Sequence, residues 1–347
     1  LTLSYGLRYS LYSYYGPGDR YEFGEPIFSG GRRPLISVSK VEGRESIKNY
    51  SGLEPRLSMN ILLGKSSSVK ASYNRMTQYI HLLSNTAASS SLDVWTPSTN
   101  NIKPEIADAY VVGYFKNFKN NTYEASIELY YKDLQNQIDY IDGADLLINK
   151  YLEGDLLTGI GRAYGLEFLF KKNRGRFNGW LSYTIGRSEL KIDGINKFEW
   201  YPTRYDQTHN FKITSTYKIS DRVQFSGNFV YLTGTPVTFP SSKFVIQGFV
   251  IPHNASNSRH QFRIPDYHRL DFSVTIKGRD EKKNGKVRKN DSELIIGVYN
   301  VYNRRNPFSI YFSQGDGMVT DSYVPGEVTR LSIIGSFVPS ITYNFKF

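Results

Sequence analysis

The chain opens with a stretch in which every second side chain is apolar, Leu1-Thr2-Leu3-Ser4-Tyr5-Gly6-Leu7-Arg8-Tyr9-Ser10-Leu11. A β-strand directs successive side chains to opposite faces, so a strand here has one apolar face and one polar face. The same alternation returns along the rest of the chain, for example at 53–63, 123–131 and 270–276. The sequence therefore predicts an all-β protein whose strands each have an apolar face.

About twelve such strands are predicted, each longer than the usual five or six residues of globular sheets and long enough to cross a tilted bilayer. The stretch at 69–82 is the least regular, because Arg75 and Thr77 interrupt its apolar face. The predicted strands are 1–14, 52–63, 69–82, 104–117, 122–133, 161–172, 177–191, 205–219, 222–235, 267–278, 292–304 and 330–347.

The connections between these strands alternate in length. Short turns fall at 64–68, 119–121, 173–175 and 220–221, with a charged one at 279–291, whereas long segments fall at 15–51, 83–103, 134–160, 192–204, 236–266 and 306–329. Tight turns at one end and extended loops at the other are typical of outer-membrane barrels. An unpaired backbone group in hydrocarbon costs several kcal/mol, so such a sheet closes on itself. The predicted fold is an antiparallel transmembrane β-barrel.

Composition excludes several other classes of protein. Among 347 residues there are 28 Tyr, 21 Phe and no Cys, and no apolar run approaches the roughly 18 residues of a membrane-spanning helix. Disulfides and Cys-ligated zinc are therefore excluded. The net charge of +11 comes from scattered Lys and Arg without a nucleic-acid-binding motif. We expect outer-membrane lipid and lipopolysaccharide as partners, and no nucleic acid.

The last predicted strand alternates without interruption from Leu331 to the terminal phenylalanine. It resembles the final strand of an outer-membrane barrel, which the bacterial barrel-assembly machinery recognises by strand addition. We predict that its apolar face is this assembly signal, made by Ile341, Tyr343, Phe345 and Phe347.

Further segments resemble the TonB-dependent transporters, and among them those of the Bacteroidetes type. Their order along the chain covers nearly its whole length, which makes the combined resemblance more specific than any single match. The segments are Gly6-Leu7-Arg8-Tyr9, Gly52-Leu53-Glu54-Pro55-Arg56-Leu57-Ser58, Lys103-Pro104-Glu105, Gly165-Leu166-Glu167 followed by Gly179-Trp180-Leu181-Ser182-Tyr183-Thr184, Tyr205-Asp206-Gln207-Thr208-His209, and Asn300-Val301-Tyr302-Asn303-Arg304-Arg305-Asn306-Pro307.

The resemblance implies that residues 1–347 are the C-terminal part of a 22-stranded barrel, with the N-terminal plug domain and the first half of the barrel absent from this chain. It also implies uptake of a scarce nutrient (an iron chelate, cobalamin, a glycan or a peptide), driven by the TonB complex through the plug. A surface lipoprotein is a further possible partner, and no cofactor is expected. The alternatives are a self-contained twelve-stranded pore, an outer-membrane enzyme or a soluble lectin-like sheet protein.

Candidate substrate-binding residues lie in the long loops. Aromatic rings and Arg bind sugars, peptides or chelates by stacking and bidentate hydrogen bonds, although an aromatic belt at the membrane boundary also explains Trp and Tyr. The candidates are Trp95, Trp200, Tyr201, Arg204, His253 and His260.

Histidines are also candidate metal ligands or catalytic bases. His253, His260, Asp266 and His268 are close in sequence, but their spacing matches no metal motif and no catalytic triad. Asp206 and His209 lie three residues apart at a predicted strand start, hence on opposite faces. We therefore expect no catalytic residue and no metal site.

Overall fold

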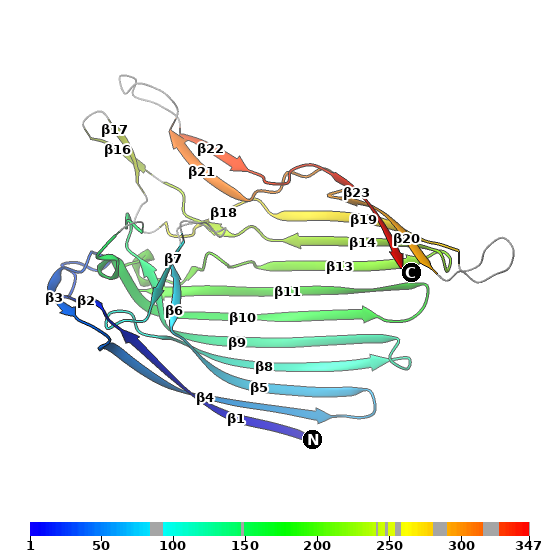
Figure 1. Ribbon diagram of the computed structural model, residues 1–347, viewed down its shortest axis with the longest axis horizontal. Helices are drawn as coiled ribbons and strands as arrows, with labels where there is room; N and C mark the ends of the chain where they lie inside the picture. Colours follow the sequence, from blue (N-terminus) through cyan, green and yellow to red (C-terminus); the bar gives the residue numbers. More distant parts are fainter. Residues whose placement is uncertain are drawn as a thin grey trace.

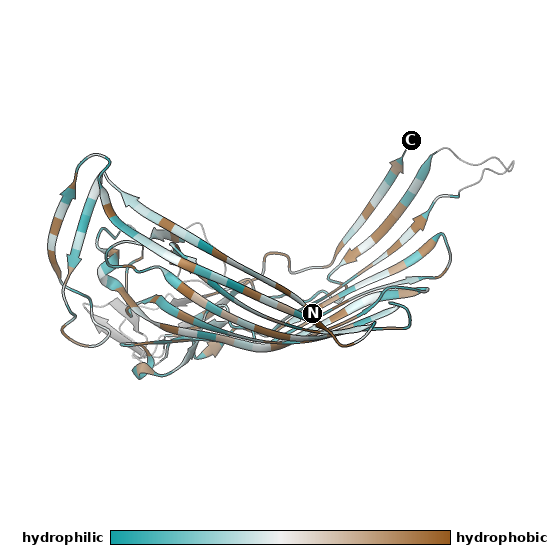
Figure 2. Cartoon of the chain, turned by 90° about the horizontal axis from the view of Figure 1, so that it is seen from below, coloured by the Kyte–Doolittle hydropathy of each residue, from teal (hydrophilic) through white to brown (hydrophobic). Residues whose placement is uncertain are grey.

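The computed structural model describes residues 1–83, 93–146, 149–240, 242–246, 249–253, 258–279, 290–314 and 326–346. Its main feature is one antiparallel sheet bent into an open trough (Figures 1 and 2). The strand order is β1-β4-β5-β8-β9-β10-β11-β13-β14-β19-β20-β23, with the short β12 beside β11. Every long strand therefore pairs with the next long strand along the chain, as in an up-and-down barrel.

All twelve predicted strands are present, including the irregular one at 69–82, which is β5. Several extend further toward the long loops than the alternation alone predicted. The long strands are β1 (Thr2–Tyr15), β4 (Ser46–Leu62), β5 (Ser67–Gln78), β8 (Glu105–Phe118), β9 (Tyr123–Tyr140), β10 (Leu156–Lys172), β11 (Phe177–Ile192), β13 (His209–Lys218), β14 (Val223–Leu232), β19 (Tyr267–Lys277), β20 (Asp291–Tyr299) and β23 (Val338–Lys346).

The final strand differs from the prediction of one continuous strand over 330–347. Only β23 belongs to the main sheet, whereas β22 (Gly326–Leu331) pairs with β21 (Ser309–Gln314) in a separate ribbon. Two hydrogen bonds hold the chain near the bend between them: Phe308 N–H donates to the Leu331 carbonyl at 2.7 Å, and the Asn300 amide donates to the Ser336 carbonyl at 3.3 Å. Because the alternation runs through both halves, the pattern does not reveal the bend.

The long connections carry small elements of their own, gathered at the end of the sheet away from the two termini (Figure 1). No helix among the described residues is both long and apolar enough to cross a membrane. The elements are β2 (Gly18–Phe23) with β3 (Leu35–Val41), β6 (Ile80–Leu83) with β7 (Val94–Pro97), β15 (Pro236–Val237) with β18 (Phe262–Arg263), β16 (Ser242–Ile246) with β17 (Phe249–His253), β12 (Tyr201–Pro202), and the 3₁₀ helices η1 (Leu152–Asp155) and η2 (Asn196–Phe198).

The register of the strands sorts the side chains onto two faces. Leu129 of β9 lies between Val112 of β8 and Leu166 of β10, and Leu166 lies beside Ile185 of β11, so these apolar side chains share one face. Apolar side chains on this face are strongly exposed; Leu129, for example, is 57% exposed. In the described part of the chain no layer of protein covers this face, which we call the outward face, as expected for a surface in contact with lipid.

Among the residues that the structure describes, two clusters of buried apolar side chains lie at the loop end of the sheet. One cluster contains Leu157, Ile192, Ile195 and Tyr201, and a second contains Leu83, Ile102 and Leu156. The sheet itself remains open, because in the described strands β1 pairs only with β4 and β23 pairs only with β20. These strands therefore do not close a barrel among themselves.

A charge placed on the outward face tests this orientation. Leu166→Arg puts a cation near the middle of the apolar face of β10 and is expected to lower the free energy of unfolding in lipid by about 2–4 kcal/mol. Glu167→Arg, on the opposite face of the same strand, is the matched control and should change it much less. Urea unfolding of the protein in lipid vesicles measures both, and equal losses would show that the faces are wrongly assigned.

Candidate functional site

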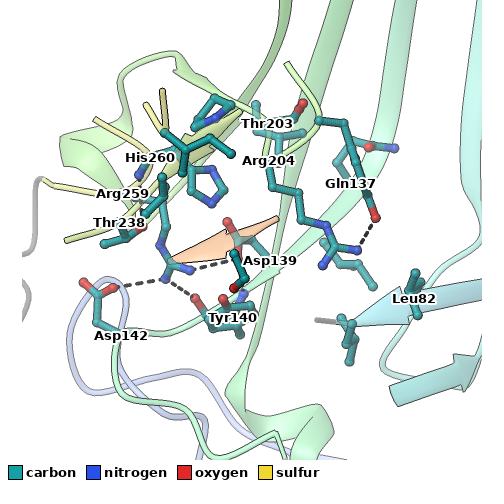
Figure 3. A pocket seen from close by; sticks show the side chains of 18 of the residues that line it. Leu82, Gln137, Asp139, Tyr140, Asp142, Thr203, Arg204, Thr238, Arg259 and His260 are labelled. Atoms are coloured by element: carbon teal, nitrogen blue, oxygen red, sulfur yellow. Dashed lines mark hydrogen bonds and ion pairs between the residues drawn. The ribbon is translucent and has the colours of Figure 1, made fainter. Parts of the chain in front are cut away.

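A cavity of about 620 Å³ lies where the long loops meet the sheet (Figure 3). The strand residues that line the cavity include Gln78 of β5, Glu105 of β8 and Leu190 of β11. The residues next to each of them in sequence point outward, so these three side chains point to the opposite face. The cavity therefore lies on the face opposite to the lipid, which is the lumen face of a barrel. The polar and aromatic side chains that line it include Gln137, Tyr140, Thr203, Arg204, Arg259 and His260.

A bulge in β9 brings the end of that strand into the cavity. The pairing of β9 with β10 shifts by one residue between Gly159 and Gly161, and Asn136 on β9 adopts a positive φ of 55°. Asparagine tolerates this conformation better than most residues. Asp133 lies on the outward face before the bulge, whereas Asp139 lies opposite Leu157 on the lumen face after it.

Arg259 is the most deeply buried cation at the cavity, with only 5% of its side chain exposed. Its guanidinium donates to Asp139 at 3.2 Å, to Asp142 at 3.0 Å and to the Tyr140 carbonyl at 2.8 Å. It also lies over the Tyr140 ring, 4.5 Å from the centroid. A buried charge is tolerated only when it is paired and hydrogen-bonded in this way.

Asp139 also binds a third segment of the chain. Tyr201, which is 2% exposed, donates its hydroxyl to the second oxygen of Asp139 at 2.8 Å. Burial raises the pKa of Tyr201, so the phenol stays a neutral donor. We call Asp139, Asp142, Tyr201 and Arg259 the Asp139 latch, because together they join the end of β9 to the β11–β13 and β14–β19 connections.

His260 lies beside the latch and faces the same cavity. Its Nδ1 is 2.8 Å from the Pro202 carbonyl, which can only accept, so Nδ1 carries the proton. Burial lowers the pKa of His260, and the ring is therefore neutral with Nε2 as an acceptor. Arg204 also lines the cavity, and its guanidinium lies 4.5 Å from the centroid of the Tyr205 ring.

The six predicted binding residues lie in different parts of the structure. Arg204 and His260 line the cavity, whereas Tyr201 is buried behind it in the latch. Trp95 is 66% exposed and lies opposite Leu82 in the β6–β7 ribbon; because Leu82 lines the cavity, Trp95 lies near its rim. His253 ends β17, and its side chain is outside the described residues. No comparison tests these roles, so they stay predictions.

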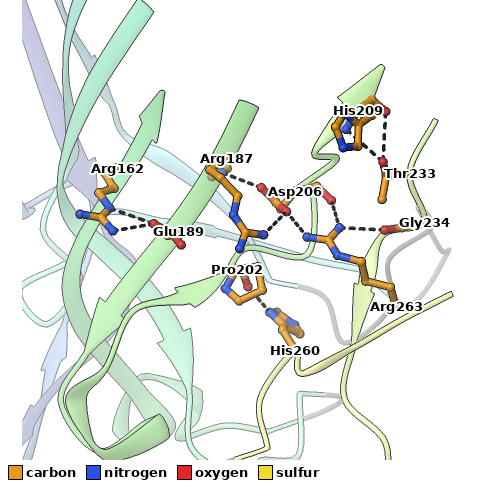
Figure 4. Close-up of polar contacts among 11 residues, drawn as sticks. Arg162, Arg187, Glu189, Pro202, Asp206, His209, Thr233, Gly234, His260 and Arg263 are labelled. Carbon is orange, nitrogen blue, oxygen red and sulfur yellow. Dashed lines mark hydrogen bonds and ion pairs between the residues drawn. The ribbon is translucent and has the colours of Figure 1, made fainter. Parts of the chain in front are cut away.

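Trp200 does not line this cavity; it lines a second cavity of about 280 Å³ together with Tyr201 and Arg259, and it also contacts the outward face of the sheet. The guanidinium of Arg162 lies 4.1 Å from the centroid of the Trp200 ring. Arg162 is on the outward face of β10, where it forms an ion pair with Glu189 of β11 at 2.8 Å (Figure 4). This position fits the aromatic belt better than the substrate cavity.

The remaining histidines and acidic groups of the loops have separate partners. His268 lies 2.8 Å from the Tyr302 hydroxyl, whereas Asp266 accepts from the Tyr231 hydroxyl at 2.6 Å. His209 contacts the Tyr183 hydroxyl at 2.8 Å, and Asp206 binds the Ser188 amide at 2.7 Å. Within the described ranges no group of three or more His, Cys, Asp or Glu side chains is arranged to hold a metal ion.

The assembly signal proposed for the last strand is only partly described. Ile341, Tyr343 and Phe345 alternate along one face of β23, and Ile341 is 76% exposed. Phe347 lies outside the described residues. A role in assembly stays a prediction.

Comparison with known proteins identifies the family. The family model described as TonB dependent receptor-like, beta-barrel, matches residues 1–301. The chain therefore belongs to this family of outer-membrane barrels of Gram-negative bacteria, whose members are receptors and transporters and not enzymes. The narrower prediction of a Bacteroidetes type is not tested by this match.

Solved structures share the fold at low sequence identity. The ferric-catecholate import receptor Fiu from E. coli K12 has a TM-score of 0.57 and 15% identity over 99% of this chain and 42% of its own. The siderophore receptor PiuA from Acinetobacter baumannii has a TM-score of 0.59 and 13% identity over 99% and 40%. The chain thus spans about two-fifths of the length of these proteins. A search of curated proteins found no match.

The Asp139 latch predicts a specific stability effect. Asp139→Ala leaves the buried Arg259 without its main partner and frees the Tyr201 hydroxyl, so the opening free energy of segments 196–202 and 258–261 should fall by about 3–5 kcal/mol. Asp142→Ala is the control, because Asp142 is 32% exposed and its loss should cost less. Amide hydrogen exchange of the two segments measures both effects, and an equal response to both variants would contradict the central role of Asp139.

His260 predicts a pH dependence of the same region. Its folded pKa lies below the ordinary value of about 6.5, so its contribution to loop stability is present above that pH and is lost as pH falls through the folded pKa. The nearby Asp139 favours the protonated ring, while Arg259 and Arg204 oppose it. The protection factors of segment 258–264, which correct for the base-catalysed intrinsic exchange rate, should therefore fall as the pH drops below about 6.5, and His260→Gln should flatten this response. A profile unchanged by the substitution would assign the pH dependence to another group.

Proposed function

We propose that this chain is the C-terminal barrel part of an outer-membrane, TonB-dependent receptor that takes up an iron chelate. The observation that carries the proposal is the cavity on the lumen face, enclosed by the long loops of a barrel of this family. Two of the similar structures are those of a ferric-catecholate import receptor and a siderophore receptor. Cobalamin, glycans and peptides remain the competing substrates.

The chemistry of the cavity supports an anionic chelate with aromatic groups. Its volume of about 620 Å³ is within the range of roughly 300–1,000 Å³ for small-molecule sites. Arg204 supplies a guanidinium, and Tyr140 and Tyr205 supply ring surfaces for stacking. Arg259 offsets one of the two negative charges of Asp139 and Asp142, so an anionic group of the chelate would be held by Arg204.

The rest of the transport machinery is also proposed. The unpaired outer edges of β1 and β23 support pairing with further strands, since an open edge in hydrocarbon is costly. We propose that residues 1–347 supply about twelve of 22 strands, that a plug domain fills the lumen, and that the TonB complex acts through this plug. The barrel-assembly machinery and a surface lipoprotein are proposed as further partners.

Binding of a ferric catecholate to the receptor tests the proposal. Arg204→Ala removes a charged hydrogen-bond donor and should weaken binding about tenfold or more. Trp95→Ala should weaken it a few-fold by removing a ring at the rim, whereas Trp200→Ala should leave it unchanged, because Trp200 contacts Arg162 on the outward face. Binding of iron-55-labelled chelate to cells measures all three.

Two results would contradict the proposal. Unchanged affinity in Arg204→Ala would remove the cavity from the binding site. If cobalamin, a glycan or a peptide binds saturably at this cavity and the ferric catecholate does not bind, the substrate is that compound and not an iron chelate.

A further inference from the structure

Two neighbouring side chains on the lumen face present hydrogen-bond acceptors to the cavity. Glu105 of β8 lies beside Gln78 of β5 in the sheet, and both side chains line the cavity. The Gln78 amide donates through Nε2 to the Ile80 carbonyl at 2.8 Å, so its oxygen Oε1 stays available as an acceptor. In the described part of the chain, the Glu105 carboxylate has an ion-pair contact with His81 alone. We call Gln78 and Glu105 the acceptor pair.

A buried histidine lies behind Glu105. The His81 side chain is 1% exposed; its Nδ1 is 3.3 Å from Oε1 of Glu105, and its Nε2 is 2.9 Å from the Ser98 hydroxyl. An ionised carboxylate only accepts hydrogen bonds, so Nδ1 carries the proton and Nε2 accepts from Ser98. Among the described residues Nδ1 has no fully formed hydrogen bond, and Glu105 is the acceptor positioned to satisfy it. One carboxylate oxygen is thereby held near His81, and the other is left for the cavity.

The β6–β7 ribbon fixes the position of this histidine. His81 lies opposite Thr96 in the ribbon, and the Ser98 amide donates to the Tyr79 carbonyl at 2.8 Å. Leu83 of the same ribbon belongs to one of the two buried apolar clusters. The imidazole therefore has a defined place from which it orients the carboxylate of the acceptor pair.

The cavity carries more negative than positive charge among the described residues. Three carboxylates line it, those of Glu105, Asp139 and Asp142. Two guanidinium groups line it as well, those of Arg204 and Arg259. Both aspartates are bonded to Arg259. Glu105 is therefore the carboxylate whose charge a cation on the ligand would balance.

Arg204 and the acceptor pair belong to different sides of the cavity. The acceptor pair is on β5 and β8, whereas Arg204 follows β12, which pairs with β11. β8 and β11 are three strand positions apart, roughly 14 Å at about 4.8 Å per strand. The Arg204 side chain extends into the cavity from its own side (Figure 3). A ligand that fills the cavity therefore meets a cation at one side and acceptors at the other.

We propose that the acceptor pair binds a primary ammonium group of the chelate, while Arg204 holds the anionic part. An ammonium group has three N–H donors and one positive charge, which suit a carboxylate beside an amide oxygen. Calcium takes roughly six to eight oxygen ligands, more than this pair supplies, and a neutral donor leaves the charge of Glu105 unbalanced. His81 is a positioning residue for Glu105. The proposal rests on the proposed uptake of an iron chelate, whose chemical class it narrows.

Two ferric catecholates that differ in one group test the proposal. The ligand of the first carries one primary amine, and the second is the same chelate with that amine acetylated. Equilibrium binding of each iron-55-labelled chelate is measured for the receptor purified in detergent, for Glu105→Gln, and for the control Glu128→Gln. Glu128 is a carboxylate on the lumen face of β9 that does not line the cavity.

The expected result is a preference that depends on Glu105. The parent receptor should bind the amine form about tenfold more tightly than the acetylated form, because a charge-assisted hydrogen bond is lost on acetylation. Glu105→Gln should bind both forms alike, with the affinity for the acetylated form unchanged. Glu128→Gln should keep the preference of the parent.

Two substitutions of His81 separate positioning from a purely structural role. His81→Asn keeps a donor near the place of Nδ1 and should retain most of the preference for the amine form. His81→Gln keeps a polar group near Ser98 but lacks the donor beside Glu105, so its preference should fall to about two- to threefold. An equal loss of affinity for both chelates in His81→Gln would contradict the positioning role.

Three results would overturn the ammonium site: equal binding of the two forms by the parent, an unchanged preference in Glu105→Gln, or the same loss of preference in Glu128→Gln. In each of these cases the acetylated chelate still binds, so the proposed uptake function stands. If neither form binds to the parent receptor, the uptake of a ferric catecholate fails, and the ammonium site fails with it. The two failures are therefore distinguishable.

Discussion

The need to pair every backbone amide and carbonyl away from water governs this structure. In hydrocarbon each unpaired group costs several kcal/mol, so the chain must form long, fully hydrogen-bonded strands. The up-and-down order from β1 to β23 meets that need with short turns at one end, leaving the long connections at the other. Large exposed side chains such as Leu129 are stable on this sheet because their environment is lipid and not water.

The loop end follows the rules of soluble proteins instead. Its side chains pack into two small hydrophobic clusters, and its buried charges are paired, as in the Asp139 latch. The cavity lies at this junction, where a rigid sheet supplies one wall and the loops supply the others. Binding sites are often built in this way, with loops positioned by a scaffold.

Much of the fold could be predicted from sequence, because the two-residue period has a direct physical cause. A strand with lipid on one side and a polar lumen on the other must alternate, and this held even for β5, whose face is interrupted by Arg75. That interruption has a meaning which the sequence could not reveal, since Arg75 pairs with Asp108 on the next long strand. The bend before β23 was missed because alternation continues through it.

The cavity was harder to predict than the sheet. Arg204 and His260, which line the cavity, could be named as candidates because loop cations and aromatics are common binding residues. Asp139 and Arg259 lie 120 positions apart and carry no local motif. The bulge at Asn136, which turns Asp139 toward the lumen, breaks the period on which the prediction relied. The position of Trp200 against Arg162 could not be inferred either, because a loop has no periodicity that indicates which face of the sheet a side chain reaches.

One consequence of the shared carboxylate concerns motion. Because Asp139 binds both Arg259 and Tyr201, the two connections that carry these residues cannot separate from β9 independently without leaving a buried charge or hydroxyl unsatisfied. We therefore expect the two connections to leave β9 together and not one at a time. Any rearrangement of this wall of the cavity would then be a concerted event that involves both connections.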